Sequence, residues 1–365
     1  MEKLFELKDI ALIPSSSNTG YRSKINYLTV DSADVTGMSQ SLPIFTSPME
    51  AIIDSNNWKV WQDQGIKPVL PRTEELETRL AACCYIFSAF SIEEVRSNFL
   101  SQNRRSMQNQ FHVCIDCGNG HDSNLLELGH RLKQLYGQQL ILMAGNIGSP
   151  ETYINYCKAG FDYVRVGMSG GSLVDRNKYG FYYPMGSLLY DITMVRSKTC
   201  VGLKPVKIIA DGGIRSQSDV MKCIALGADY VMIGREFSKL IEAAGTIYRK
   251  TEKDGEEIME EVRNPESLLN VPLAELVSLD LVRQYCGNTT PEIQAIRQGY
   301  RNIEEWKKQN PRIKISDSSW EWVKIEESLQ DWIRDFKDCV DYSFMMSNAA
   351  DYETFRKNVK FGRIS

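Results

Sequence analysis

The chain contains Ile208-Ile209-Ala210-Asp211-Gly212-Gly213-Ile214-Arg215, and the similar stretch Val231-Met232-Ile233-Gly234-Arg235 follows it. Each is a short apolar run that stops at glycine, which is typical of a buried strand ending in a tight turn. Because glycine has no Cβ atom, its backbone N–H group can approach an anion closely. In a (β/α)8 barrel, the loops after strands 7 and 8 form such a phosphate site. The two stretches therefore predict successive barrel strands and a phosphate-binding site.

Short apolar runs recur along the chain, and polar segments with helical spacing separate most of them. The predicted strands are Leu42-Met49, Lys67-Pro71, Cys84-Phe90, Phe111-Asp116, Leu140-Asn146, Tyr163-Val166, Lys207-Asp211 and Tyr230-Ile233. This repeated strand and helix pattern predicts an α/β fold, a (β/α)8 TIM barrel.

Two regions depart from the barrel repeat. Residues Thr246 to Asn264 alternate around Asp254-Gly255, which is a hairpin signal, and the charged segment that follows lacks strong periodicity. We interpret residues 246–319 as a mobile flap inserted after strand 8, beside the barrel mouth. A helical pattern returns over Glu326 to Phe336, and a short element at 359–364 ends the chain. We therefore expect one barrel domain over residues 1–365, with a C-terminal helical extension.

Composition excludes several classes of function. The formal net charge is −4 over 365 residues, so no basic field would attract nucleic acid. No apolar run approaches the roughly 20 residues that span a bilayer, and the first residues do not form a signal peptide. We expect a soluble, cytoplasmic protein without a nucleic-acid or membrane partner.

The nine cysteines are an odd number without regular spacing, which predicts reduced thiols and no disulfide framework. Cys114 and Cys117 form a CxxC pattern, but no second pair or nearby histidine completes a zinc site. On a strand, their side chains would point to opposite faces. The sequence therefore predicts no metal site.

Motifs in a fixed order make the chain resemble the inosine monophosphate dehydrogenase and guanosine monophosphate reductase family. The motifs are 7–14 with 21–23, 42–50, 115–121, 143–147, 160–167, the turns at 211–213 and 233–234, 285–288 and the tail 355–365. The long dehydrogenases of this family carry a CBS pair after strand 2, whereas here Pro71-Arg72 runs directly into Thr73-Glu74. The compact length and Asn119-Gly120 favour the reductase branch.

The resemblance implies roles for individual residues in binding a purine nucleoside monophosphate. Ser172 corresponds to the loop serine that binds the phosphate, together with the N–H groups of Gly213 and Gly234. Asp211 corresponds to the carboxylate that accepts hydrogen bonds from both ribose hydroxyls. Positions along the nucleotide, at its phosphate and at its base edge are Ser47, Met49, Tyr285 and Asn288.

The resemblance also implies a nicotinamide cofactor, NADP or NAD, and a homotetramer of barrels packed side by side. Asp116, Asn119 and Asn146 lie at strand ends or turns of the catalytic face, where they would order the substrate or the nicotinamide.

The loop after strand 6 departs from the family. The family pattern places a catalytic cysteine in Gly-x-Gly-Ser-x-Cys-x-Thr, and this chain has Val174 at the cysteine position. In the family, the thiolate forms a covalent adduct with the purine, which valine cannot do. The loop is also one residue shorter, which argues against the family's potassium site because loop carbonyl groups form it.

Three interpretations of the departure remain open. The first is a purine-nucleotide oxidoreductase that transfers hydride without a covalent step, with Asp175, Arg176, Asp317 and Cys117 as acid, base or relocated-nucleophile candidates. His121 is a further acid–base candidate. The second is a catalytically silent nucleotide-binding protein. The third is an FMN enzyme, because FMN barrels place an arginine such as Arg235 at the phosphate.

Overall fold

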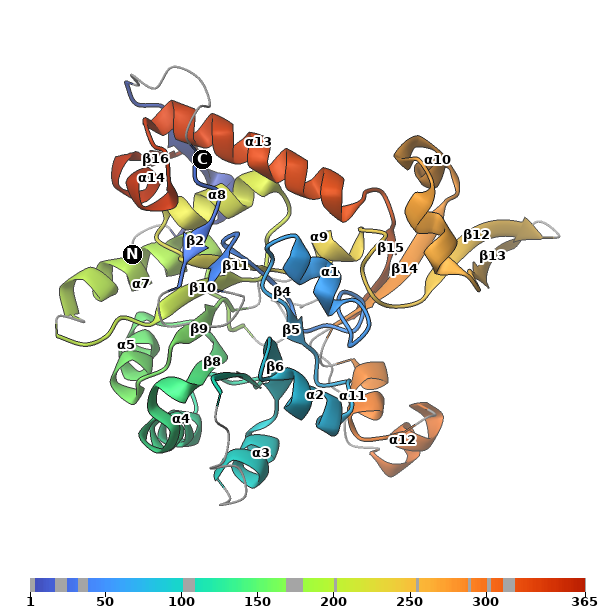
Figure 1. The fold of residues 1–365 in the computed structure, drawn as a ribbon, viewed down its shortest axis with the longest axis horizontal. Coiled ribbons are helices and arrows are strands. Elements are labelled where there is room, and N and C mark those ends of the chain that lie inside the picture. Colours follow the sequence, from blue (N-terminus) through green and yellow to red (C-terminus); the bar gives the residue numbers. More distant parts are fainter. Residues whose placement is uncertain are drawn as a thin grey trace.

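Eight parallel strands form the central sheet of the protein, in the order β4-β11-β10-β9-β8-β7-β6-β5. A parallel bridge between Phe45 and Lys67 joins the two end strands, so the sheet closes into a barrel (Figure 1). The structure is a computed structural model, and it describes residues 4–16, 25–31, 39–100, 109–168, 180–199, 202–253, 256–287, 290–300, 303–310 and 319–364. The predicted (β/α)8 fold is confirmed.

Each predicted strand segment corresponds to one strand of the barrel, and only β8 extends beyond its segment, by one residue. The strands are β4 (Ile44–Thr46), β5 (Val69–Leu70), β6 (Phe87–Phe90), β7 (Phe111–Asp116), β8 (Leu140–Ile147), β9 (Tyr163–Val166), β10 (Lys207–Asp211) and β11 (Tyr230–Ile233). The strands are apolar on both faces because one face packs inside the barrel and the other against the outer helices.

Helices surround the barrel between the strands (Figure 1). They are α1 (Trp58–Asp63), α2 (Leu76–Ala82), α3 (Ile92–Val95) with the π-helical turn η2 (Arg96–Leu100), α4 (Ser123–Tyr136), α5 (Pro150–Ala159), α7 (Met185–Thr199), α8 (Gln217–Ala225) and α9 (Arg235–Ser238). The last of these has only 4 residues. The C-terminal helix α13 (Leu329–Ser347) supplies the missing cover, because Trp332 packs on Phe237 with ring centroids 5.0 Å apart, and Phe237 packs on Trp61.

The barrel interior is a packed core, with residues from every strand. Its buried members are Phe45, Val69, Phe87, Ala89, Cys114, Ile141, Met143, Tyr163, Ile209, Tyr230 and Met232. The hairpin of β2 (Thr29–Val30) and β3 (Gln40–Ser41) lies against this core, where the hydroxyl of Tyr163 donates to the buried Asp31. Lys207, the first residue of β10, forms an ion pair with the same carboxylate.

The region after β11 is more regular than the sequence indicates. The predicted hairpin is confirmed, since β12 (Ile247–Lys253) pairs with β13 (Glu256–Glu261). The sequence pattern does not predict β14 (Leu281–Cys286) or β15 (Trp320–Lys324), which complete a four-stranded sheet in the order β13-β12-β14-β15. Burial of β14 is almost continuous, so it shows no polar–apolar alternation. Short helices lie between these strands: η5 (Pro265–Asn270), α10 (Leu273–Ser278), α11 (Pro291–Arg297) and α12 (Ile303–Gln309).

A buried arginine attaches this sheet to the barrel. Arg283 of β14 is 0% exposed, and its guanidinium group donates to backbone carbonyl groups that follow β11. The acceptors are the carbonyl oxygens of Ser238, Leu240, Ile241 and Ala243, at 2.7 to 3.5 Å. Burial lowers the pKa of Arg283 to about 10.

The two ends of the described chain lie side by side. The predicted C-terminal helix is confirmed but longer than predicted, and it is followed by α14 (Tyr352–Asn358). The terminal strand β16 (Lys360–Arg363) pairs antiparallel with β1 (Ile10–Ile13), which follows the short helix η1 (Leu7–Asp9).

Candidate functional site

The turn after β10 has the backbone shape that the sequence predicts. Gly212 and Gly213 have φ values of 106° and 77°, which side chains with a Cβ atom rarely adopt. A cavity of about 100 Å³ touches both glycines and is also lined by two basic residues, Lys8 and Arg215, and two acidic residues, Glu6 and Asp219. The turn is therefore accessible from a side that carries charges of both signs.

Four predicted substrate residues meet at the ends of β4 and β11. The hydroxyl of Tyr285 donates to Met49 Sδ at 3.2 Å. A Cβ atom on Gly234 would lie 2.7 Å from Tyr285 Oη and 3.7 Å from Ser47 Cβ. Tyr285 belongs to β14, so the inserted sheet contributes directly to this side of the barrel mouth.

Arg235 already has carboxylate partners. Its Nε donates to Glu321 Oε1 of β15 at 2.6 Å, and Glu236 lies 3.7 Å from Nη1. The hydrogen bond to Glu321 raises the pKa of Arg235. A phosphate ligand of the FMN type would have to compete with these two acids for the guanidinium group.

Arg165 organises the opposite side of the site. This residue lies within β9 and is buried. Its Nη1 donates to Asp116 Oδ1 at 2.7 Å, and its Nε donates to Asp211 Oδ2 at 2.8 Å. Asn146 Nδ2 also donates to Asp211 Oδ2, at 2.9 Å. The structure thus brings together three predicted residues, Asp116, Asn146 and Asp211, through an arginine for which the sequence analysis proposed no role.

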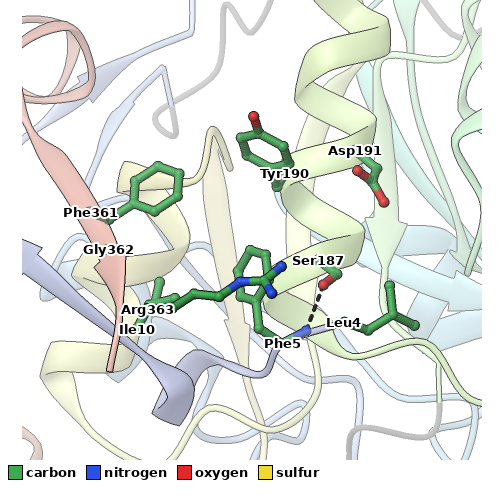
Figure 2. A pocket seen from close by; sticks show the side chains of 9 residues that line it. All are labelled: Leu4, Phe5, Ile10, Ser187, Tyr190, Asp191, Phe361, Gly362 and Arg363. Atoms are coloured by element: carbon green, nitrogen blue, oxygen red, sulfur yellow. Dashed lines mark hydrogen bonds between the residues drawn. The ribbon is translucent and has the colours of Figure 1, made fainter. Parts of the chain in front are cut away.

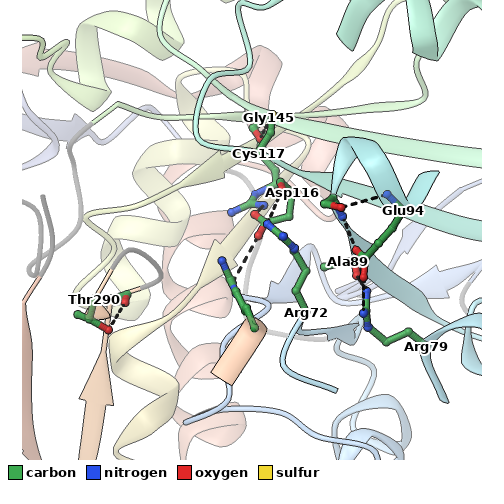
Figure 3. A network of polar contacts seen from close by, with 12 residues as sticks. Arg72, Arg79, Ala89, Glu94, Asp116, Cys117, Gly145 and Thr290 are labelled. Atoms are coloured by element: carbon green, nitrogen blue, oxygen red, sulfur yellow. Dashed lines mark hydrogen bonds and ion pairs between the residues drawn. The ribbon is translucent and has the colours of Figure 1, made fainter. Parts of the chain in front are cut away.

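Asp116 also faces Arg72 and Arg297. Arg72 Nη1 donates to the backbone oxygen of Asp116 at 3.4 Å (Figure 3). Arg297, at the end of α11, places Nη2 3.7 Å from Asp116 Oδ2. Burial alone would raise the pKa of Asp116, but Arg165 and Arg297 hold it below its ordinary value. Asp116 is therefore a carboxylate at neutral pH.

The environment of Cys117 disfavours a nucleophilic role. Burial and the neighbouring charge of Asp116 raise the pKa of the Cys117 thiol to about 11, and its Sγ donates to the backbone oxygen of Gly145 at 3.5 Å (Figure 3). A reactive cysteine requires the opposite shift.

His121 and Asn119 have structural partners. His121 accepts from Gly148 N at 3.0 Å through Nε2, so Nδ1 donates to Thr152 Oγ1 at 2.7 Å. The Asn119 side chain accepts from His121 N at 3.0 Å. These contacts hold the turn after β7 against the start of α5.

Glu50, directly after Met49, was not predicted as a site residue. Its Oε2 is buried without a hydrogen-bond partner. Burial raises the pKa of Glu50 to about 7, with the nearby charge of Arg297 acting in the opposite direction. Burial raises the pKa of Tyr285, and the nearby charge of Glu50 raises it further. Glu50 is therefore a buried carboxyl group whose pKa lies near neutral pH.

Several predicted site residues lie outside the described residues. They are Ser172, Asp175, Arg176, Asn288 and Asp317, and Val174 at the cysteine position also lies outside them.

The site residues that the sequence did not predict differ in how visible they are in the sequence. Arg165 is a charge inside an apolar strand, which is a detectable anomaly because an arginine there needs buried partners. Arg72 and Glu50 each follow a barrel strand on the catalytic face. Arg297 has no comparable signal, since only the fold brings α11 to the barrel mouth.

A cavity of about 450 Å³ lies elsewhere, between the N-terminal segment, α7 and β16 (Figure 2). Its lining includes Phe5, Tyr190, Asp191, Phe361 and Arg363 but none of the predicted site residues. Within the described ranges, no cluster of three or more His, Cys, Asp or Glu side chains could hold a metal ion. No described helix has the length and apolar character needed to cross a membrane.

Comparisons with known proteins support the family that the motifs suggest. Residues 96–258 match the family model described as IMP dehydrogenase / GMP reductase domain. The GMP reductase of Bacillus subtilis is 31% identical over 263 residues, which cover 70% of this chain and 76% of the relative. The GMP reductase of Clostridium acetobutylicum is 31% identical over 264 residues, with the same coverage of both chains. That of Shouchella clausii is 29% identical over 263 residues.

Proposed function

Because the chain belongs to the IMP dehydrogenase / GMP reductase family, we propose that it binds a purine nucleoside monophosphate and oxidises or reduces it with NADP or NAD. The observation that carries this proposal is the convergence of Ser47, Met49, Gly234 and Tyr285, with Asp211 close enough to raise the pKa of Tyr285 beyond the effect of burial, since all five were predicted as nucleotide-binding residues. They come from four strands, β4, β10, β11 and β14, or from the turns after them.

The nucleotide would lie across the barrel mouth. The N–H groups of Gly213 and Gly234, with Ser172, would bind the phosphate, and Asp211 would accept hydrogen bonds from the ribose hydroxyls. Arg165 and Asn146 hold Asp211 Oδ2, so the carboxylate is oriented before the ligand arrives. Since Oδ2 is held in this way, the position of Oδ1, the oxygen that would face the ribose, is also fixed.

The residues on the far side fit a nicotinamide dinucleotide. Asp116 and Asn146 supply a carboxylate and an amide, which can bind the carboxamide of the ring, and Arg72 supplies donors for an anionic group. When bound, the cofactor would donate or accept the hydride.

Val174 at the cysteine position supports a reaction without a covalent thiol adduct. The protein would then supply only positioning and proton transfer, for which Asp175, Arg176, Asp317 and Glu50 are candidates. The same replacement supports the second candidate, a silent nucleotide-binding protein, because the predicted binding residues are kept while the nucleophile is absent.

A binding panel tests the proposal. The unfolding temperature and the calorimetric binding of IMP, XMP, GMP, AMP and FMN would be measured with and without NADPH or NADH. A ligand at 100 times its Kd adds about 2.7 kcal/mol of stability, which is readily detected. We expect one purine monophosphate to bind, and Asp211→Asn to weaken it about tenfold to a hundredfold through loss of charge-assisted hydrogen bonds.

Asp335→Asn is the matched control. Asp335 lies on α13, which carries none of the predicted site residues, and its side chain forms an ion pair with the exposed Arg334. Purine binding that is unaffected by either nicotinamide cofactor would favour the silent binder. Absence of any purine binding would refute the proposed ligand, and a bound yellow FMN would favour the flavin enzyme.

A further inference from the structure

Three arginines contact Asp116, each at a different oxygen atom. Arg165 contacts Oδ1, Arg297 lies near Oδ2, and Arg72 contacts the backbone oxygen. Arg165 and Arg297 are almost completely buried, with side chains 6% and 8% exposed. Several positive charges are therefore held together in a region with little water.

The neighbouring carboxylates already have close partners. Asp116 and Asp211 both pair with Arg165. Glu94 pairs with Arg79 at 2.7 Å and also accepts from Ser91 N (Figure 3). Within the described part of the chain, Arg72 forms no ion pair, and its Nε is buried without a hydrogen-bond partner.

The position of Arg72 separates it from the predicted phosphate turns. Arg72 follows β5, whereas Gly213 and Gly234 follow β10 and β11. In the closed sheet, β4 lies between β11 and β5. The hydrogen bond to Asp116, the last residue of β7, shows that the Arg72 side chain extends toward β7, in the direction away from β4 and β11. The nucleotide phosphate at Gly213 and Gly234 would leave Arg72 unneutralised.

We propose that Arg72 and Arg297 bind an anionic group of the second ligand of this site, the one that lies beyond the purine nucleotide. The group is a phosphate of the dinucleotide or a carboxylate, because both present the paired oxygens that a guanidinium fork recognises. This inference rests on the proposed function, since it assigns the second ligand of the same site.

The electrostatics of Arg297 agree with this role. Burial lowers its pKa, and the positive charges of Arg72 and Arg165 lower it further, against the attraction of Asp116 and Glu50. An anion between Arg72 and Arg297 would offset this repulsion. Since Arg297 belongs to α11, such a ligand would also join the inserted region to the barrel.

Calorimetry on the full-length protein, saturated with the purine monophosphate that binds best, tests this inference. The titrants are NADPH, NADH, inorganic pyrophosphate and succinate, which separate a phosphate source from a carboxylate source. We expect at least one titrant to bind and Arg72→Gln and Arg297→Gln each to weaken it by about tenfold or more. Arg72→Lys, which keeps the charge but loses the fork, should show an intermediate loss.

Arg334→Gln is the control, because Arg334 is an exposed arginine of α13. The purine affinity of the Arg72 variants should stay within about twofold of the parent, and their thermal unfolding verifies that they fold. Equal titrant affinity in the parent and the Arg72→Gln variant, or no binding of any of the four titrants, would overturn the inference while leaving purine binding intact. Loss of purine binding in the parent protein would instead refute the proposed function.

Discussion

On the side of β10 and β11, the barrel mouth consists of glycine turns and close contacts between Tyr285, Met49 and Gly234, whereas on the side of β5 to β9 it consists of charged side chains around Asp116. The first side depends on the absence of side-chain atoms. The second depends on balancing charges that have little access to water. The two sides should therefore respond differently to substitution, the first to added volume and the second to removed charge.

Arg165→Met gives the largest expected effect, because it removes one partner from two buried ion pairs. Removing one partner of a buried pair costs about 3–5 kcal/mol. The free energy of unfolding in urea should fall by about this amount, while Arg334→Met on the exposed surface of α13 should change it by less than about 1 kcal/mol. Equal effects of the two variants would show that the charge network does not stabilise the barrel.

Gly234→Ala tests the tightly packed side. The new Cβ atom would lie 2.7 Å from Tyr285 Oη, so we expect a loss of about 1–3 kcal/mol from overpacking. Adding Tyr285→Phe should recover part of that loss, because it removes the atom that the Cβ meets. Gly118→Ala is the control, since a Cβ atom added there would meet no atom of the described residues within 4 Å. A loss that Tyr285→Phe leaves unchanged would mean that the contact is not the cause.

Glu50→Gln sharpens the comparison at the boundary of the two sides. The pKa of Glu50 is raised from 4.5 to about 7, so the folded state binds its proton more tightly than the unfolded state. The contribution of Glu50 to the free energy of unfolding is therefore complete below pH 4.5, declines as the pH rises and is lost above about pH 7. The difference in free energy of unfolding between Glu50→Gln and the parent should therefore shift by about 1–3 kcal/mol in favour of the variant between pH 5 and pH 8.

Urea unfolding of both proteins across this pH range measures the difference. Tyr285 and Arg297 both interact with Glu50. The free energies of unfolding of the two proteins are therefore compared at every pH, and only the difference between them is assigned to Glu50. A difference that is independent of pH would contradict the raised pKa.

The sequence was sufficient to predict the barrel and the glycine turn after β10. Apolar runs ending in glycine, such as 208–213, report directly on buried strands and tight turns because the signal is local. The strand β14 was missed because it is buried almost continuously inside an otherwise charged segment. The shortness of the eighth helix has no local signal, because α13, distant in sequence, takes over its packing role.

The charged side could be predicted only in part. Asp116 and Asn146 were identified from their positions at strand ends, but their partner Arg165 was not assigned a role. Arg297 could not be found from local pattern at all, because its contact with Asp116 joins residues far apart in the chain. A network of this kind depends on tertiary structure, and its members have no fixed spacing in the sequence.

The attachment of β14 through Arg283 has a consequence for redesign of this barrel. The guanidinium group belongs to the inserted sheet, but the carbonyl oxygens that accept from it belong to the last residue of α9 and the chain that follows α9. Trimming the insertion to a short loop would thus strip hydrogen-bond donors from the scaffold as well as remove Tyr285 from the site. The inserted sheet is consequently not a detachable module, and a minimal version of this scaffold must retain β14 or replace its buried donor.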